Sequence, residues 1–176
     1  MESKKQRKKE AELLSTGPTT VRLHAHYLKG CLGNQKNGIV VKYKRSHFLI
    51  SLDTECFLVG FNDLYDLFKL DGLDVSLLRC FTLWMIVETK EKALPVGFLD
   101  PELISSSTIQ SDKSYVVDYV TKAFCHFSKK ELIIGHNPGD HWILVVIIPK
   151  WSKVWCFDSL RSKPRDHTLL KEVIDE

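Results

Sequence analysis

The chain has 176 residues, of which 44% are apolar, and these values suit one domain with its own hydrophobic core. Its net charge of +3 comes from residues 1–10, MESKKQRKKE, which hold five Lys or Arg and two Glu and leave 20 basic and 20 acidic side chains elsewhere. A nucleic-acid-binding surface would need a basic stripe on the folded part, so we expect no nucleic-acid partner. The apolar runs fall short of the roughly 20 residues that span a bilayer, so no membrane partner is expected either.

The cysteines are odd in number and form no C-x-x-C pair, which indicates reduced thiols in the nucleus or the cytosol. No apolar segment near the N-terminus resembles a signal peptide. The basic start fits a nuclear address or a solvated tail; both remain open, with the nucleus as the expected location. His24, His26 and Cys31 lack a second half with zinc-finger spacing, so we expect an ordinary loop and no metal site.

In chain order, a basic tail and irregular lead-in (1–38) precedes a domain that covers residues 39–176. Residues 39–61 are rich in Val, Ile and Phe with partial alternation, which predicts two or three short strands. Residues 62–88 carry apolar side chains at spacings of three and four, the pattern of two amphipathic helices.

Capping residues set the expected starts of these two helices. Asn62 or Asp63 suits the first N-terminus and Asp74 suits the second. The stripe of large apolar side chains on the second helix is expected to lie in the core. It consists of Phe81, Trp84 and Met85.

The next segment, KEKALPVGF, breaks the helix and leads into a polar loop. A further helix is expected from about Lys113 to Ser128. A short strand follows at Leu132–Ile134, and Asn137-Pro138-Gly139 suits a type II turn.

Two more strands are expected near the C-terminus. The segment 142–148 is apolar at every position, which predicts a strand covered on both faces. The loop 149–153 leads to a return strand at 154–157, so the two strands should form an antiparallel hairpin.

His141 and Asp158 bracket this hairpin at its open end. A two-residue turn places them directly opposite each other, and a four-residue loop makes them a diagonal pair on the same face. Their Cβ atoms are then about 4.5–5.5 Å or about 7–8 Å apart, so the imidazole and the carboxylate can meet. Such a pair fixes the tautomer of a histidine and stabilises its protonated form. A surface ion pair, or a histidine bonded to a backbone carbonyl, is the structural alternative.

The order of several motifs resembles one enzyme family. His-Trp opens an apolar strand in ELIIGHNPGDHWILVVI, and Asp-Ser-Leu follows the next strand in FDSL; LDVSLLRCFTLWMI and GFLDPELI lie upstream. This order resembles the ubiquitin-like-protein-specific (Ulp/sentrin) cysteine proteases, and most of all the Ulp-like domains of plant transposon-related proteins. The resemblance covers about residues 60–162.

The resemblance implies an α+β fold, a partial papain-like cysteine protease domain with a helical layer packed on a mixed or antiparallel sheet. It implies a cysteine peptidase that needs no cofactor and whose partner is a ubiquitin-like modifier of the SUMO type. By position, His141 would be the general base, Asp158 its orienting partner and Trp142 one wall of the channel for the modifier's Gly-Gly tail. Gly72-Leu73-Asp74 stands where the family places a second Trp.

The nucleophile is where the chain departs from this pattern. The family's catalytic Cys and oxyanion-hole Gln follow the Asp, whereas neither residue type occurs between Asp158 and Glu176. Cys156 and Cys125 are both expected to be core residues. We therefore expect an incomplete domain that lacks the nucleophile-bearing segment and is inactive as printed. The alternative is a non-catalytic module that binds a ubiquitin-like modifier.

Overall fold

The structure is a computed structural model, in which part of the chain is described. The described residues are 17–19, 21–22, 25, 37–139, 141–160 and 167–176. The basic residues 1–10 and the three residues weighed as metal ligands, His24, His26 and Cys31, lie outside this part. The described residues at 18–19, 21–22 and 25 have helical backbone, although no regular structure was predicted there.

The chain forms two compact units, Met1–Val41 with Cys56–Leu77 and Lys42–Glu55 with Leu78–Glu176. Strands β1 (Gly38–Lys44) and β2 (Thr54–Gly60) form a two-stranded sheet, and each of the two units contains one end of it. The prediction of strands over 39–61 is thus confirmed, with the 3-10 helix η2 (Arg45–Phe48) between them.

Helix α3 (Phe61–Lys69) belongs to the first unit and confirms the first predicted helix. Its N-cap is Gly60, two or three residues before the predicted caps Asn62 and Asp63. The Asp63 carboxylate accepts a hydrogen bond from the Gly60 N–H at 3.0 Å, so this side chain does stabilise the helix N-terminus.

The second unit is built on a four-stranded sheet in the order β3-β4-β5-β6. Its strands are β3 (Val96–Phe98), β4 (Glu131–His136), β5 (Ile143–Ile148) and β6 (Lys153–Phe157). Strands β3 and β4 are parallel, whereas β4, β5 and β6 form an antiparallel meander. The expected α+β class with a mixed sheet is confirmed; β3 was not predicted.

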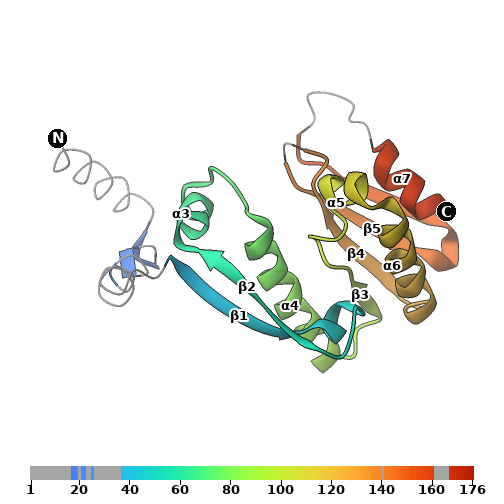
Figure 1. Cartoon of the computed structure of the whole chain (residues 1–176), viewed down its shortest axis with the longest axis horizontal. Helices are drawn as coiled ribbons and strands as arrows, with labels where there is room; N and C mark the ends of the chain where they lie inside the picture. Colours follow the sequence, from blue (N-terminus) through green and yellow to red (C-terminus); the bar gives the residue numbers. More distant parts are fainter. Residues whose placement is uncertain (1–16, 20, 23–24, 26–36, 140, 161–166) are drawn as a thin grey trace. The chain divides into compact units, whose positions relative to one another are not determined.

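Helices α5 (Ser106–Ser111), α6 (Lys113–His126) and α7 (Thr168–Asp175) cover one face of this sheet (Figure 1). The predicted helix after residue 113 is confirmed, whereas α5 and α7 were not predicted. Alternate residues of the two central strands point to these helices and are fully buried. They are Leu132, Ile134 and His136 of β4 and Ile143, Val145 and Ile147 of β5. The five apolar residues among them form the main core with Val116 and Val120 of α6 and Val173 of α7.

Helix α4 (Val75–Glu91) packs near the other face of the sheet. A Cβ on Gly135 would lie 2.6 Å from the Leu78 side chain, so glycine is required for this close approach. The predicted cap is confirmed, because the Asp74 carboxylate accepts a hydrogen bond from the Ser76 N–H at 2.8 Å. No helix in the described part of the chain is long and apolar enough to cross a bilayer.

The predicted core stripe of α4 is wrong for its two aromatic residues. Phe81 and Trp84 are each 54% exposed, and their rings contact each other on the outside of the helix. The buried side of α4 is polar instead, with Arg79, Thr82 and Thr89. The two threonine hydroxyls donate to backbone carbonyls of the preceding turn, and Arg79 has buried acidic and phenolic partners, so polar residues tolerate burial here.

Arg79 is the centre of a buried polar network within the second unit. Its guanidinium donates to the Asp100 carboxylate at 2.8 Å and to the Tyr43 hydroxyl at 2.7 Å, and it also pairs with Glu102. Asp100 is only 1% exposed. Burial raises the pKa of Asp100, an effect that the adjacent guanidinium opposes, and burial raises the pKa of Tyr43 to about 12.

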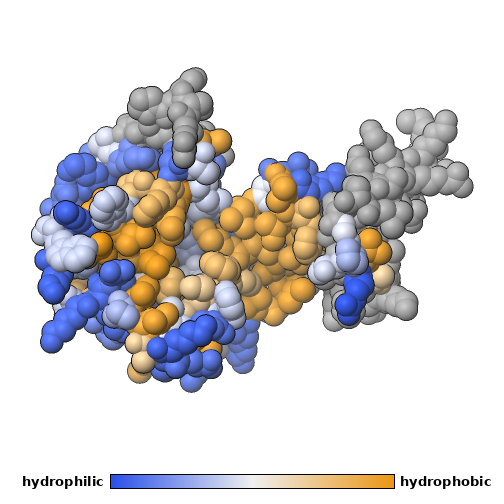
Figure 2. All heavy atoms as spheres, turned by 180° about the vertical axis from the view of Figure 1, so that it is seen from behind, coloured by the Kyte–Doolittle hydropathy of each residue, from blue (hydrophilic) through white to orange (hydrophobic). Residues whose placement is uncertain are grey.

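The second face of the β5–β6 hairpin is open in the described structure, so the prediction of a strand covered on both faces is wrong. Burial alternates along β5, and Leu144 is exposed. Trp155 and Phe157 of β6 share that face and are 51% and 55% exposed. We call Leu144, Val146, Trp155 and Phe157 the open face. Seen from behind, the second unit presents a broad apolar area (Figure 2).

Candidate functional site

The candidate site lies at the open end of the β5–β6 hairpin. His141 precedes β5 by two residues and Asp158 directly follows β6. The chain reaches His141 through a turn in which the Asn137 side chain accepts a hydrogen bond from the Gly139 N–H at 2.8 Å. Gly139 has φ of 139°, a backbone conformation that favours glycine, in line with the turn expected at Asn137-Pro138-Gly139.

The two predicted residues meet directly. The Nε2 atom of His141 lies 2.6 Å from Oδ1 of Asp158, and the side chains are 14% and 20% exposed. Ile148 pairs with Lys153, so the hairpin has the four-residue loop, and position 141 is diagonal to 158 on the helix-covered face. Of the two hairpin geometries considered, the diagonal one is therefore correct.

A second hydrogen bond fixes the carboxylate. The Leu160 N–H donates to the same Asp158 oxygen at 2.8 Å, which closes a tight turn directly after β6. The carboxylate is therefore held by its own loop as well as by the imidazole.

This geometry sets the tautomer of the histidine. Ionised Asp158 can only accept, so Nε2 of His141 must carry the proton between them. In the neutral ring, Nδ1 is then the basic nitrogen through which His141 would take a proton from a nucleophile or a water molecule. The pair therefore has the chemistry of an oriented general base.

Trp142, the third predicted site residue, is half-buried and follows His141 directly. Its partial exposure is compatible with the predicted role as a wall of a substrate channel. Gly72, at the position where the resemblance would place a second Trp, belongs to the first unit.

The described cysteines supply no activated thiol beside this pair. Cys156 and Cys125 are both exposed, so their prediction as core residues is wrong. Cys156 lies two residues before Asp158, about 7 Å along the strand at roughly 3.3 Å per residue, so the thiol is further from the open end of the hairpin than the carboxylate that contacts His141. Desolvation by neighbouring groups raises the pKa of the Cys80 thiol and also that of the Cys156 thiol, the opposite of what a thiolate nucleophile requires.

The other two described thiols lie elsewhere in the fold. Cys125 lies in the last turn of α6, shortly before β4 begins, and so at the end of the sheet away from His141. Cys56 belongs to the first unit.

Sequence reasoning missed His136, a second histidine near the site. It is fully buried at the end of β4, where its Nδ1 donates to the Ile104 carbonyl at 2.7 Å. Burial lowers its pKa, so this ring is neutral and structural. The available signal was its alternation with Leu132 and Ile134, which places it on the core face of the strand.

Comparison of the chain with models of protein families, with curated proteins and with solved structures gives no match. Within the described residues, no group of three or more His, Cys, Asp or Glu is placed to hold a metal ion. The chemistry of the site therefore rests on the geometry of His141 and Asp158.

The short contact predicts a titration effect. In the variant Asp158→Asn, the pKa of His141 should fall, because the carboxylate no longer stabilises the imidazolium ion. An NMR titration of the imidazole resonances of both proteins measures this change. The buried His136 provides an internal control, since its titration should be the same in both proteins. Equal pKa values of His141 in the two proteins would contradict the pairing.

Proposed function

We propose that this domain is a Ulp-like relative of the papain-type cysteine peptidases that binds the C-terminal tail of a ubiquitin-like modifier of the SUMO type. The observation that carries the proposal is the 2.6 Å contact between His141 and Asp158. The pair stands directly before a half-buried Trp142, in the chain order on which the family resemblance rests.

The roles follow from the atoms that the pair presents. Asp158 orients the imidazole through Nε2, and Nδ1 of His141 would accept the proton of an attacking thiol and later return it to the leaving amine. Trp142 would bind the flat Gly-Gly tail, whose missing side chains allow a tryptophan ring to lie against the backbone. These roles are those of the family's general base, orienting partner and channel wall.

The activity that we propose is binding without turnover. A peptidase of this class needs a thiolate next to its base, and Cys156 lies too far along the strand to provide it. Its raised pKa works against the same role. The position and the raised pKa of Cys156 together favour a domain of peptidase ancestry that binds the modifier over a domain that cleaves it.

A modifier with a thiol-reactive group at its C-terminus tests the proposal. We expect reversible binding and no covalent adduct for the 176-residue chain with a SUMO-type probe. Trp142→Ala should weaken this binding by about 2 kcal/mol, or roughly 30-fold, as for a central aromatic contact. Calorimetry measures the affinity, and intact-mass analysis reports the adduct.

Trp151→Ala is the matched control, because this exposed tryptophan lies at the closed end of the same hairpin. It should bind the probe as the parent chain does. A covalent adduct would contradict the proposal that the domain is non-catalytic. The absence of binding to ubiquitin-like probes would contradict the proposal that its partner is a ubiquitin-like modifier.

A further inference from the structure

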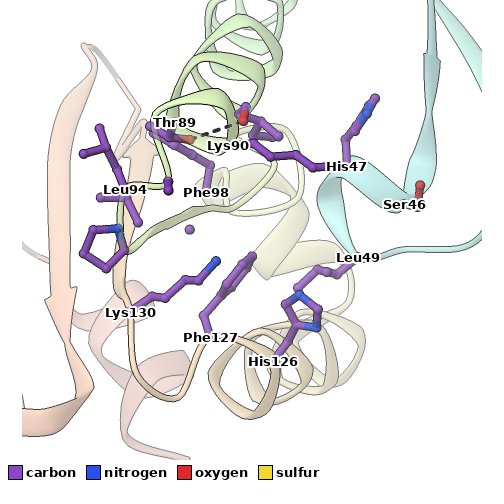
Figure 3. Close-up of a pocket in the computed structure, with 15 residues that line it drawn as sticks. Ser46, His47, Leu49, Thr89, Lys90, Leu94, Phe98, His126, Phe127 and Lys130 are labelled. Atoms are coloured by element: carbon purple, nitrogen blue, oxygen red, sulfur yellow. Dashed lines mark hydrogen bonds between the residues drawn. The ribbon is translucent and has the colours of Figure 1, made fainter.

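A cavity of about 620 Å³ opens beside the edge strand β3, within the second unit. It is bordered by η2, by the segment from the end of α4 through β3, and by the turn between α6 and β4 (Figure 3). Its volume lies in the range of small-molecule sites, about 300–1,000 Å³. The cavity adjoins the start of β4, whereas His141 lies beyond the other end of that strand, so it is separate from the candidate peptidase site.

The inner surface of the cavity is apolar and partly aromatic. Phe98 and Phe127 contribute rings, and Leu49, Ile86 and Leu94 add aliphatic surface. The Phe127 ring lies directly on the backbone of Gly97, where a Cβ would come within 2.7 Å of it. The ring position is therefore fixed by the strand beneath it, and Phe127 forms a rigid part of the cavity wall.

The rim of the cavity is basic. Lys90, Lys130, His47 and His126 are among the lining residues, and none of the lining residues is acidic. The Lys130 ammonium group lies 5.4 Å from the centre of the Phe127 ring and points toward the middle of the cavity (Figure 3). Within the described residues, neither lysine forms an ion pair with a carboxylate.

We propose that this cavity binds a small planar organic anion. Its flat apolar body would lie against Phe127 and Phe98, and its carboxylate or phosphate would be held by Lys130 and Lys90. An apolar floor alone would accept any hydrophobic compound, but a rim that carries two lysine ammonium groups and no carboxylate selects negative ligands. This site is independent of the modifier-binding function proposed above.

Titration with 2-naphthoate, followed by amide NMR shifts, tests the proposal. The shifts should cluster at residues 46–49, 86–98 and 126–130. The neutral 2-naphthylmethanol should bind about tenfold more weakly because it lacks the charge that the lysines recognise. 2-Naphthyl phosphate, compared with 2-naphthoate, identifies which anionic group is preferred, and either preference supports the site.

Lys130→Met keeps the length of the side chain and should weaken binding of 2-naphthoate about tenfold. Lys150→Met is the control with the same change in charge, and it should not alter the affinity, since Lys150 lies in η3 outside the cavity. If Lys130→Met fails to fold, Lys90→Met tests the same rim. Equal binding of the neutral compound, an unaffected Lys130→Met variant, or shifts centred on the open face of β5–β6 would each overturn the proposal.

Discussion

Arg79→Met should lower the free energy of unfolding by about 3–5 kcal/mol, the cost of leaving a buried charge without its partner. The guanidinium lies 2.8 Å from the Asp100 carboxylate, which is almost completely buried. Without Arg79, this carboxylate must take up a proton or remain charged in the core. Burial already raises its pKa, so loss of the guanidinium raises it further. Urea denaturation at neutral pH measures the change.

A double variant separates the loss of the Arg79–Asp100 attraction from the cost of leaving one buried charge without a partner. Arg79→Met with Asp100→Leu should be less destabilised than the sum of the two single variants, because neither charge then remains unpaired. Lys92→Met is the control, since its exposed pair with Glu88 should contribute no more than about 0.5 kcal/mol. A loss below about 1 kcal/mol for Arg79→Met would show that the ion pair does not stabilise this core.

Trp155→Lys combined with Phe157→Lys should remove most of the hydrophobic-dye fluorescence and of the self-association that we expect of the parent chain. Both side chains are about half exposed on the edge strand β6, where unpaired backbone groups and apolar side chains favour aggregation. Dye fluorescence and light scattering measure the two properties. The free energy of unfolding should change by only about 0.5 kcal/mol per site, since exposed positions contribute little packing.

Leu52→Lys is the control for that experiment, because Leu52 is an exposed apolar residue away from the open face. It should leave both dye fluorescence and scattering unchanged. A parent chain that is monomeric and binds no dye would contradict the expected behaviour of the open face. So would a double variant that scatters light as strongly as the parent chain.

The hairpin and the contact within it were predictable from sequence, because both depend on local patterns. Side chains alternate between the two faces of a strand, so the apolar strands and the two possible loop lengths placed His141 and Asp158 on one face. The structure has the diagonal one of the two geometries. Helices α4 and α6 were predictable for a similar reason, since each is long enough for its apolar spacing to recur.

The short elements escaped prediction. Strand β3 has three residues and helix α5 has six, which is less than the length over which a periodic pattern can be recognised. These elements are defined by their neighbours: Gly97 of β3 is held between β4 and the Phe127 ring. Sequence periodicity contains no information about such contacts.

Helix α4 shows a different limit. Its apolar stripe was recognised, but the stripe does not say which side another element will cover. Arg79 lies inside because Asp100 follows β3 and supplies a buried countercharge, a pairing between residues 21 positions apart. The same tertiary pairing leaves Phe81 and Trp84 outside. The signal that was available was an arginine in the middle of an apolar helix.

The parallel pairing of β3 with β4 has a consequence for the order in which the second unit assembles. The antiparallel strands β4, β5 and β6 are joined by short connections, so they can associate soon after collapse of a local segment. Strand β3 reaches β4 only across residues 99–130, which include α5 and α6. Because that long loop must close before β3 can pair, we expect the meander to form first and β3, with the Arg79–Asp100 pair, to be added late.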